Sequence, residues 1–239
     1  MACLVLWAAP LISTTVLAQS LTVTGSLETA SQGKTRPRQP NSEDAVVWLT
    51  SLADTHALPA APAKRHFTLV QKNKTFEPHV LVVPVGAEVD FPNKDPFFHN
   101  VFSLFDGKRF DLGLYESGSS RTLHFDKPGI SYLFCNIHSE MSAVVIVLET
   151  PYYAVSGRSN RIEIPQVPPG RYMLHLWKEG YPADLLKSLS RPIAVSETSS
   201  SFGTLTLPER ANVPLAHKNK YGRDYEEPTT PGQVYIDHH

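Results

Sequence analysis

The chain has 239 residues, with 22 Lys and Arg against 23 Asp and Glu, so its formal net charge is −1. This balance excludes the strongly basic surface that nucleic-acid binding requires, and we expect no nucleic-acid partner. Proline makes up 20 of the 239 residues, about 8% against roughly 5% in average proteins, which favours strands and turns over long helices. The length fits one or two compact β-rich domains.

The N-terminal segment is typical of an export signal. Residues 4–18 carry no charge, are too short to span a bilayer, and end in small residues before Gln19. We therefore expect residues 1–18 to be a signal peptide and the mature protein to be periplasmic or secreted, without an integral membrane segment. Cleavage removes Cys3 and leaves Cys135 as a lone thiol, which in an oxidising compartment is buried and inert, catalytic, or bound to a metal.

Two short β-like runs precede the central part of the chain, within residues 19–63, and a Pro/Ala-rich linker follows them. Neither run can bury its apolar face alone. The expected strands of this region cover residues 21–25 and 45–49.

Residues 64–149 contain strand candidates at regular spacing, separated by turn signals. This pattern is typical of an antiparallel β-sandwich. The expected strands cover residues 66–70, 80–83, 88–91, 100–103, 121–125, 130–134 and 143–148.

A second β-like block covers residues 150–208, with expected strands at 161–164, 171–177 and 202–207. Residues 209–239 are polar and carry little to bury. We expect this tail to be extended or disordered.

The residues with metal-binding chemistry lie in the loop after the expected strand 130–134. Cys135, His138 and Met141 follow one another at spacings of three on one turn, and His99 stands at the start of another expected strand. One thiolate, two imidazoles and a thioether are the ligand set of a trigonal blue-copper site with a weak axial Met. Two alternatives remain: an inert buried thiol beside ordinary histidines, and Glu140 in place of Met141.

Residues 66 to 149 resemble the cupredoxin family, in particular its plastocyanin and pseudoazurin type. The resemblance rests on the H-N-V motif at His99 and the C-x-x-H-x-x-M motif at Cys135, together with the F-E-P, V-P-V-G and V-D-F-P-N motifs upstream. It implies a Greek-key β-sandwich with a single type 1 copper per chain.

The resemblance also implies a role for each motif residue. His99, Cys135 and His138 would be the equatorial ligands and Met141 the axial one, and Asn100 would tie the two ligand loops together beside the sulfur. Plastocyanins are single-domain proteins, whereas this chain has flanking segments on both sides. The family's usual partners are therefore not carried over to it.

The flanking segments have a resemblance of their own. Residues 161–174 are similar to the second half of a carboxypeptidase-regulatory-like, transthyretin-like β-sandwich, and residues 23–25 and 45–49 resemble its first half. This implies one smaller sandwich that is split around the cupredoxin, the alternative being two separate flanks. Chains that combine these parts resemble bacterial proteins labelled methylamine-utilisation proteins.

These features together predict an all-β exported blue copper protein that carries single electrons between redox partners, which the sequence does not identify. The alternative is a copper-binding or copper-delivery module, or a surface-binding module with a structural metal. We expect no enzymatic activity, because the sequence lacks the His-Cys-His bridge of multicopper oxidases, and the expected mature chain lacks the second Cys of a binuclear copper site. Ile137 and one of Phe97 and Phe98 are expected to form an exposed apolar rim beside His138.

Overall fold

A computed structural model describes residues 20–30, 44–53, 66–104, 107–157, 160–208 and 218–225. The predicted signal peptide, the linker before residue 64 and most of the predicted tail lie outside the described residues. Among the described residues, no helix is both long and apolar enough to cross a membrane.

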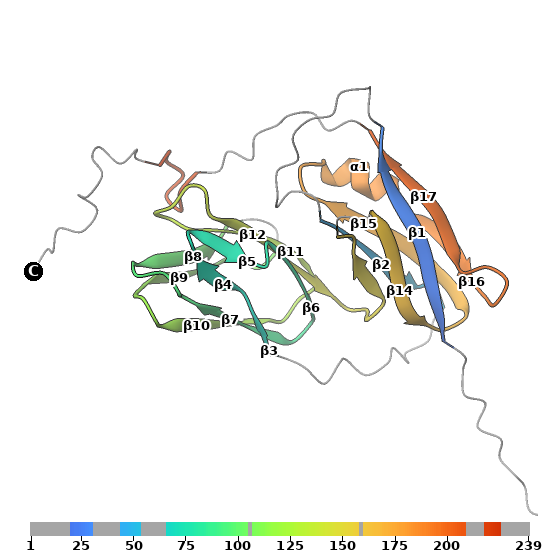
Figure 1. The fold of residues 1–239 in the computed structure, drawn as a ribbon, viewed down its shortest axis with the longest axis horizontal. Helices are drawn as coiled ribbons and strands as arrows, with labels where there is room; N and C mark the ends of the chain where they lie inside the picture. The colour runs from blue at the N-terminus through green and yellow to red at the C-terminus, as the bar shows by residue number, and fades with distance from the viewer. Residues whose placement is uncertain are drawn as a thin grey trace, which may run out of the picture.

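The central part of the chain forms a β-sandwich, which we call the inserted sandwich (Figure 1). Its two sheets share a core that includes Phe91, Val101, Phe125 and Leu133, and a short hairpin lies beside them. The larger sheet has the order β6 (Val80–Pro84), β12 (Ser142–Leu148), β11 (Gly129–Phe134), β8 (His99–Ser103) and β9 (Phe110–Tyr115). The smaller sheet has the order β10 (Ser120–Phe125), β7 (Ala87–Pro92) and β3 (His66–Thr68), and the hairpin strands are β4 (Val70–Lys72) and β5 (Thr75–Glu77).

The strand pairing of the inserted sandwich is mixed, whereas the sequence predicted an antiparallel sandwich. β12 pairs with β6 in parallel, and β3 pairs with β7 in parallel. Both pairs join segments that are separated by several other strands, and parallel neighbours need such a long connection. The predicted strand 66–70 is also broken at the buried Leu69, between β3 and β4.

The flanking segments form a second sandwich, which we call the split sandwich. β1 (Leu21–Thr29) lies between β14 (Arg161–Val167) and β17 (Ser201–Leu207) in one sheet. In the other sheet, β2 (Ala45–Ser51) lies between β13 (Tyr153–Val155) and β15 (Gly170–Lys178), and β16 (Arg191–Val195) follows β15. The short helix α1 (Ala183–Ser188) connects β15 to β16. The predicted fold class, all-β with a second sandwich split around the first, is confirmed.

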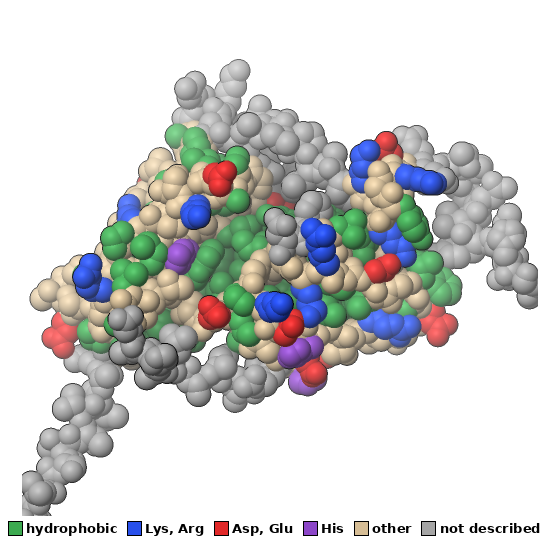
Figure 2. Space-filling model, turned by 180° about the vertical axis from the view of Figure 1, so that it is seen from behind, with side chains coloured by type: hydrophobic (Ala, Val, Ile, Leu, Met, Phe, Trp, Pro, Cys, Tyr) green, Lys and Arg blue, Asp and Glu red, His purple; other side chains and the backbone are tan. Residues whose placement is uncertain are grey.

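The two sandwiches lie side by side and share one hydrophobic cluster (Figure 1). β12 is buried on both faces: Val145 and Val147 belong to the core of the inserted sandwich, whereas Val144 and Ile146 pack with the split sandwich. This explains the continuous apolar run in β12, because a strand with one solvent-exposed face would alternate. In the space-filling view, hydrophobic side chains gather between the two lobes (Figure 2).

Polar contacts also join the two sandwiches. The Trp177 indole donates a hydrogen bond to the Tyr132 hydroxyl at 3.2 Å, and His79 Nε2 lies 2.8 Å from Glu179 Oε2. The other ring nitrogen of His79 lies 3.0 Å from the carbonyl oxygen of Ser142, at the start of β12. His79 therefore links the split sandwich to the strand that follows Met141.

Candidate metal centre

His99, Cys135 and His138 come together at one end of the inserted sandwich. His99 is the first residue of β8, Cys135 follows the last residue of β11, and His138 lies on the turn that leads to β12. The Cys135 sulfur lies 3.8 Å from His99 Nδ1 and 3.5 Å from His138 Nδ1, and the two Nδ1 atoms are 3.1 Å apart. Among the described residues, no other group of His, Cys, Asp and Glu side chains brings three such ligand atoms together.

The three ligand atoms fit a single metal ion. Donors that each lie about 2.0 to 2.3 Å from one ion in a trigonal plane are roughly 3.5 to 4 Å apart, and the observed separations are close to this range. A thiol and two imidazoles are also the donor types that suit copper.

The turn between β11 and β12 is closed by its own backbone. The Cys135 N–H donates to the Met141 carbonyl oxygen at 3.3 Å, and the Met141 N–H donates to the His138 carbonyl oxygen at 3.2 Å. Met141 is fully buried and belongs to the same hydrophobic cluster as Cys135. Glu140, the alternative ligand in the sequence analysis, is exposed.

The Cys135 thiol lies in a buried position that main-chain donors surround. Burial raises its pKa, and hydrogen bonds from the backbone N–H groups of Asn100, Ile137 and His138 oppose this rise without cancelling it. Without a cation the thiol therefore stays protonated at neutral pH. A bound metal favours the thiolate, and the three N–H groups are already positioned to stabilise it.

His138 is the partly exposed member of the group. Burial lowers its pKa to about 4, and the proximity of His99 and Lys74 contributes to the decrease. The His138 ring is therefore neutral at pH 7, and it faces the other two donors with Nδ1.

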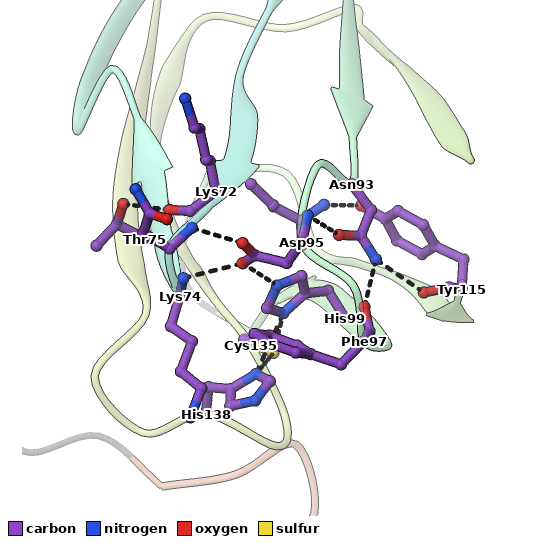
Figure 3. A network of polar contacts seen from close by, with 12 residues as sticks. Lys72, Lys74, Thr75, Asn93, Asp95, Phe97, His99, Tyr115, Cys135 and His138 are labelled. Atoms are coloured by element: carbon purple, nitrogen blue, oxygen red, sulfur yellow. Dashed lines mark hydrogen bonds and ion pairs between the residues drawn. The ribbon is translucent and has the colours of Figure 1, made fainter. Parts of the chain in front are cut away.

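Asp95 is a residue of the candidate site that the sequence did not predict. Its carboxylate lies 2.8 Å from His99 Nε2, on the side of the ring opposite to Cys135 (Figure 3). The carboxylate thus accepts a hydrogen bond from the Nε2–H group of His99. This keeps the ring proton on Nε2 and leaves Nδ1 without a proton, so that Nδ1 can bind a metal. The only signal was an Asp four residues before His99, in a segment that we interpreted as a simple turn.

A hairpin turn holds the Asp95 carboxylate in place. The backbone N–H groups of Asn73 and Lys74 donate to its two oxygens at 2.6 and 2.9 Å (Figure 3). Asn73 and Lys74 connect β4 to β5 with φ angles of 53° and 55°, as in a two-residue hairpin turn of the I′ type. Burial raises the pKa of Asp95, but the hydrogen bonds from Lys74, His99 and Asn73 outweigh it, so the net pKa is lowered.

The loop before β8 is fixed by Asn93. Its amide nitrogen donates to the Phe97 carbonyl oxygen at 2.8 Å, and its amide oxygen accepts the Asp95 N–H at 3.0 Å (Figure 3). The Phe97 ring then packs against both imidazoles, with its centroid 5.2 Å from that of His99 and 5.4 Å from that of His138. Phe97 is half-buried and Phe98 is 42% exposed, so only one of these two residues is on the surface, as predicted.

Asn100 lies beside the Cys135 sulfur, as expected, but its side chain contacts β9 and not the second ligand loop. Its backbone N–H is the group that faces the Cys135 sulfur. Its side-chain amide donates instead to Asp111 Oδ1 at 2.7 Å and to the Gly113 carbonyl oxygen at 3.0 Å, both in β9. Asn100 therefore ties the cysteine to β9 through its backbone and side chain together.

No protein-family model matches the sequence, and a search of curated proteins gives no match. Among solved structures, the chain is similar to a copper-containing nitrite reductase from Thermus scotoductus SA-01, with 26% identity over 41% of this chain and 25% of that one, at a TM-score of 0.34. A purple cupredoxin from Nitrosopumilus maritimus is 22% identical, over 34% of this chain and 99% of that one, at a TM-score of 0.32.

An amicyanin variant in its Cu(I) form is 20% identical, over 35% of this chain and 83% of that one, at a TM-score of 0.34. The match to the nitrite reductase, in contrast, spans only a quarter of the length of that protein. Because all three TM-scores are low, the metal-site assignment rests on the donor geometry of this chain.

Proposed function

We propose that this protein is a cupredoxin-type electron carrier that holds one type 1 copper ion per chain. The observation that carries the proposal is the convergence of the Cys135 thiol with the Nδ1 atoms of His99 and His138. These three residues would hold the copper, and Met141, buried on the same turn, would be its fourth, weaker ligand. Bound copper supplies one-electron chemistry between Cu(II) and Cu(I).

The protein residues prepare the site for electron transfer by holding the donors still. Asp95 fixes the ring of His99, and the backbone hydrogen bonds of the 135–141 turn fix the positions of Cys135 and His138. A rigid mixed set of sulfur and imidazole donors suits neither oxidation state strongly, so the ligands need to move little when the charge changes.

A carrier is favoured over an enzyme because of the way the donors are buried. His99 and Cys135 are completely buried, and His138 is the ligand with a partly exposed ring. Catalytic metal sites keep an open coordination position for substrate, whereas four protein ligands would fill this one. We infer that electrons enter and leave through the His138 ring, and that the partners are redox proteins in the periplasm or outside the cell.

The experiment that tests this function is a potentiometric titration of the copper-loaded protein in the presence of a Cu(I) chelator. An electron carrier should bind one copper per chain, cycle reversibly by one electron and keep its copper in the reduced state. Rapid transfer of Cu(I) to the chelator would instead favour the alternative function of copper delivery. A metal that is not reduced at any accessible potential would leave only a structural role.

A further inference from the structure

A short segment of the C-terminal tail packs on the metal-ligand turn. Residues 218–225, which we call the tail turn, are organised around Asn219, whose side-chain oxygen accepts the backbone N–H groups of Tyr221 at 3.0 Å and Arg223 at 3.1 Å. The Asn219 N–H also donates to the Arg223 carbonyl oxygen at 2.9 Å. The sequence predicted an extended or disordered tail, whereas this part of it is a closed turn.

The tail turn contacts Cys135 directly through Tyr225. The Tyr225 hydroxyl donates a hydrogen bond to the Cys135 carbonyl oxygen at 2.8 Å. The ring is half-buried, and burial raises the pKa of its hydroxyl, so the phenol remains a donor at neutral pH. One residue further along the ligand turn, the side-chain oxygen of Asn136 accepts the backbone N–H of Lys220 at 3.0 Å.

A second chain of contacts connects the tail turn to the Cys135 sulfur. The Lys220 amine lies 2.7 Å from Asp111 Oδ2, and Asp111 Oδ1 accepts the side-chain amide of Asn100 at 2.7 Å. The backbone N–H of Asn100 in turn faces the Cys135 sulfur. The tail turn is thus connected both to the carbonyl group and to the thiol of the same residue.

We propose that the tail turn is a positioning element of the metal centre, which holds Cys135 in its ligand position through Tyr225 and through the Lys220–Asp111–Asn100 chain. This inference rests on the proposed function, because it assigns a role at the same site. Its physical basis is that Cys135 lies just beyond the last β11–β12 residue pair, where its N–H is held by Met141 at 3.3 Å and its carbonyl oxygen is held by Tyr225. Groups outside the ligand set commonly control how firmly a ligand is held.

The test compares two substitutions that each remove one phenol oxygen hydrogen-bonded to a backbone carbonyl. Tyr225→Phe removes the donor to Cys135. Tyr181→Phe is the matched control, because the half-buried Tyr181 donates to the Pro208 carbonyl oxygen at 3.2 Å in the split sandwich. Both are made in the full chain with Cys3→Ser, so that Cys135 is the only thiol. The first readout needs no metal: it is the rate at which a thiol reagent labels Cys135 in the native apo protein.

We expect Tyr225→Phe to label roughly 2- to 10-fold faster than the parent chain, the factor that corresponds to one lost neutral hydrogen bond, and Tyr181→Phe to label at the parent rate. The second readout is the rate at which the copper-loaded protein loses copper to a chelator, which should rise by a similar factor in Tyr225→Phe alone. A chain that ends at residue 217 loses both connections and should show effects at least as large.

Equal labelling and copper-loss rates in the parent, both Phe variants and the truncated chain would overturn the inference. This result is distinguishable from a failure of the proposed function. If the parent chain bound no copper through a thiolate, the electron-carrier assignment would fall, while the labelling rates would still decide whether the tail turn holds Cys135.

Discussion

We expect the Asp95 carboxylate to support the candidate metal centre, and a single substitution can isolate its effect. It accepts a hydrogen bond from His99 Nε2 and so fixes the ring and increases the basicity of Nδ1. Asp95→Asn keeps the shape but removes the charge, and we expect copper affinity to fall about 10- to 100-fold. A competition titration with a copper chelator measures this fall. Asp126→Asn, at an exposed carboxylate paired with Lys108, serves as the control, and equal affinities in the two variants would contradict the role of Asp95.

Met141 should tune the copper more than it holds it, because the axial bond of a trigonal site is long and weak. Met141→Gln introduces a harder oxygen donor that favours Cu(II), so the reduction potential should fall. Met141→Leu removes the donor, and the potential should rise. Cyclic voltammetry of the three proteins measures both shifts, and identical potentials would exclude Met141 as a ligand.

The close packing of β1 against β17 makes Gly25 a sensitive position in the split sandwich. A Cβ atom at Gly25 would lie 2.1 Å from the Phe202 ring, which is itself buried, so the ring would have to move. We expect Gly25→Ala to lower the free energy of unfolding by about 1 to 3 kcal/mol, as overpacking of a core does. Denaturant unfolding measures the loss. An unchanged midpoint would show that the two strands are less tightly packed than described.

The elements that the sequence predicted are those in which a periodic pattern reports burial. The long core strands β12 and β15 were visible because apolar residues recur along them. β9 and β16 were missed, since few of their residues are buried and they lie at sheet edges. An edge strand carries a weak hydrophobic pattern and is recognisable only from its pairing partner.

The candidate site was also only partly predictable from the sequence. The four proposed ligands could be recognised because their spacing lies within two short motifs. Asp95 and Tyr225 could not, because each reaches the site through a contact that no local pattern encodes: Asp95 depends on the turn of a separate hairpin, and Tyr225 lies far from Cys135 in the sequence. Whether the four ligands bind copper remains a prediction.

The contact between the two sandwiches should respond to pH through His79. Burial lowers the pKa of His79, but the Glu179 carboxylate, aided by Ser142 and Asp44, outweighs burial and raises the pKa above its ordinary value of 6.5. A raised pKa in the folded state means that the stabilisation is complete below pH 6.5 and is lost as the pH rises through the folded-state pKa. Thermal unfolding across pH should therefore show that the melting temperature of the wild type exceeds that of His79→Gln by the largest margin at low pH. A stability difference that does not vary with pH would contradict this role.

The surface around His138 is the region where the whole molecule should meet its redox partners. Ile137 is 40% exposed beside His138, and Phe98 is 42% exposed on the loop before His99. A small apolar rim suits a transient contact, since weak redox encounters bury less than about 1,200 Å². Ile137→Lys and Phe98→Lys should slow electron self-exchange in mixtures of oxidised and reduced protein, measured by NMR line broadening. Leu52→Lys, at an exposed residue of the split sandwich, should leave the self-exchange rate unchanged. Equal slowing by all three substitutions would show that the docking surface is not centred on His138.

The central claim is that Cys135 binds copper as a thiolate between two imidazoles, and the visible absorption spectrum of the oxidised, copper-loaded protein tests it most directly. The account predicts an intense blue thiolate-to-copper charge-transfer band at one copper per chain, which disappears in Cys135→Ser while the β-sheet circular dichroism is unchanged. A copper-loaded wild-type protein without this band, or a Cys135→Ser variant that keeps it, would contradict the claim.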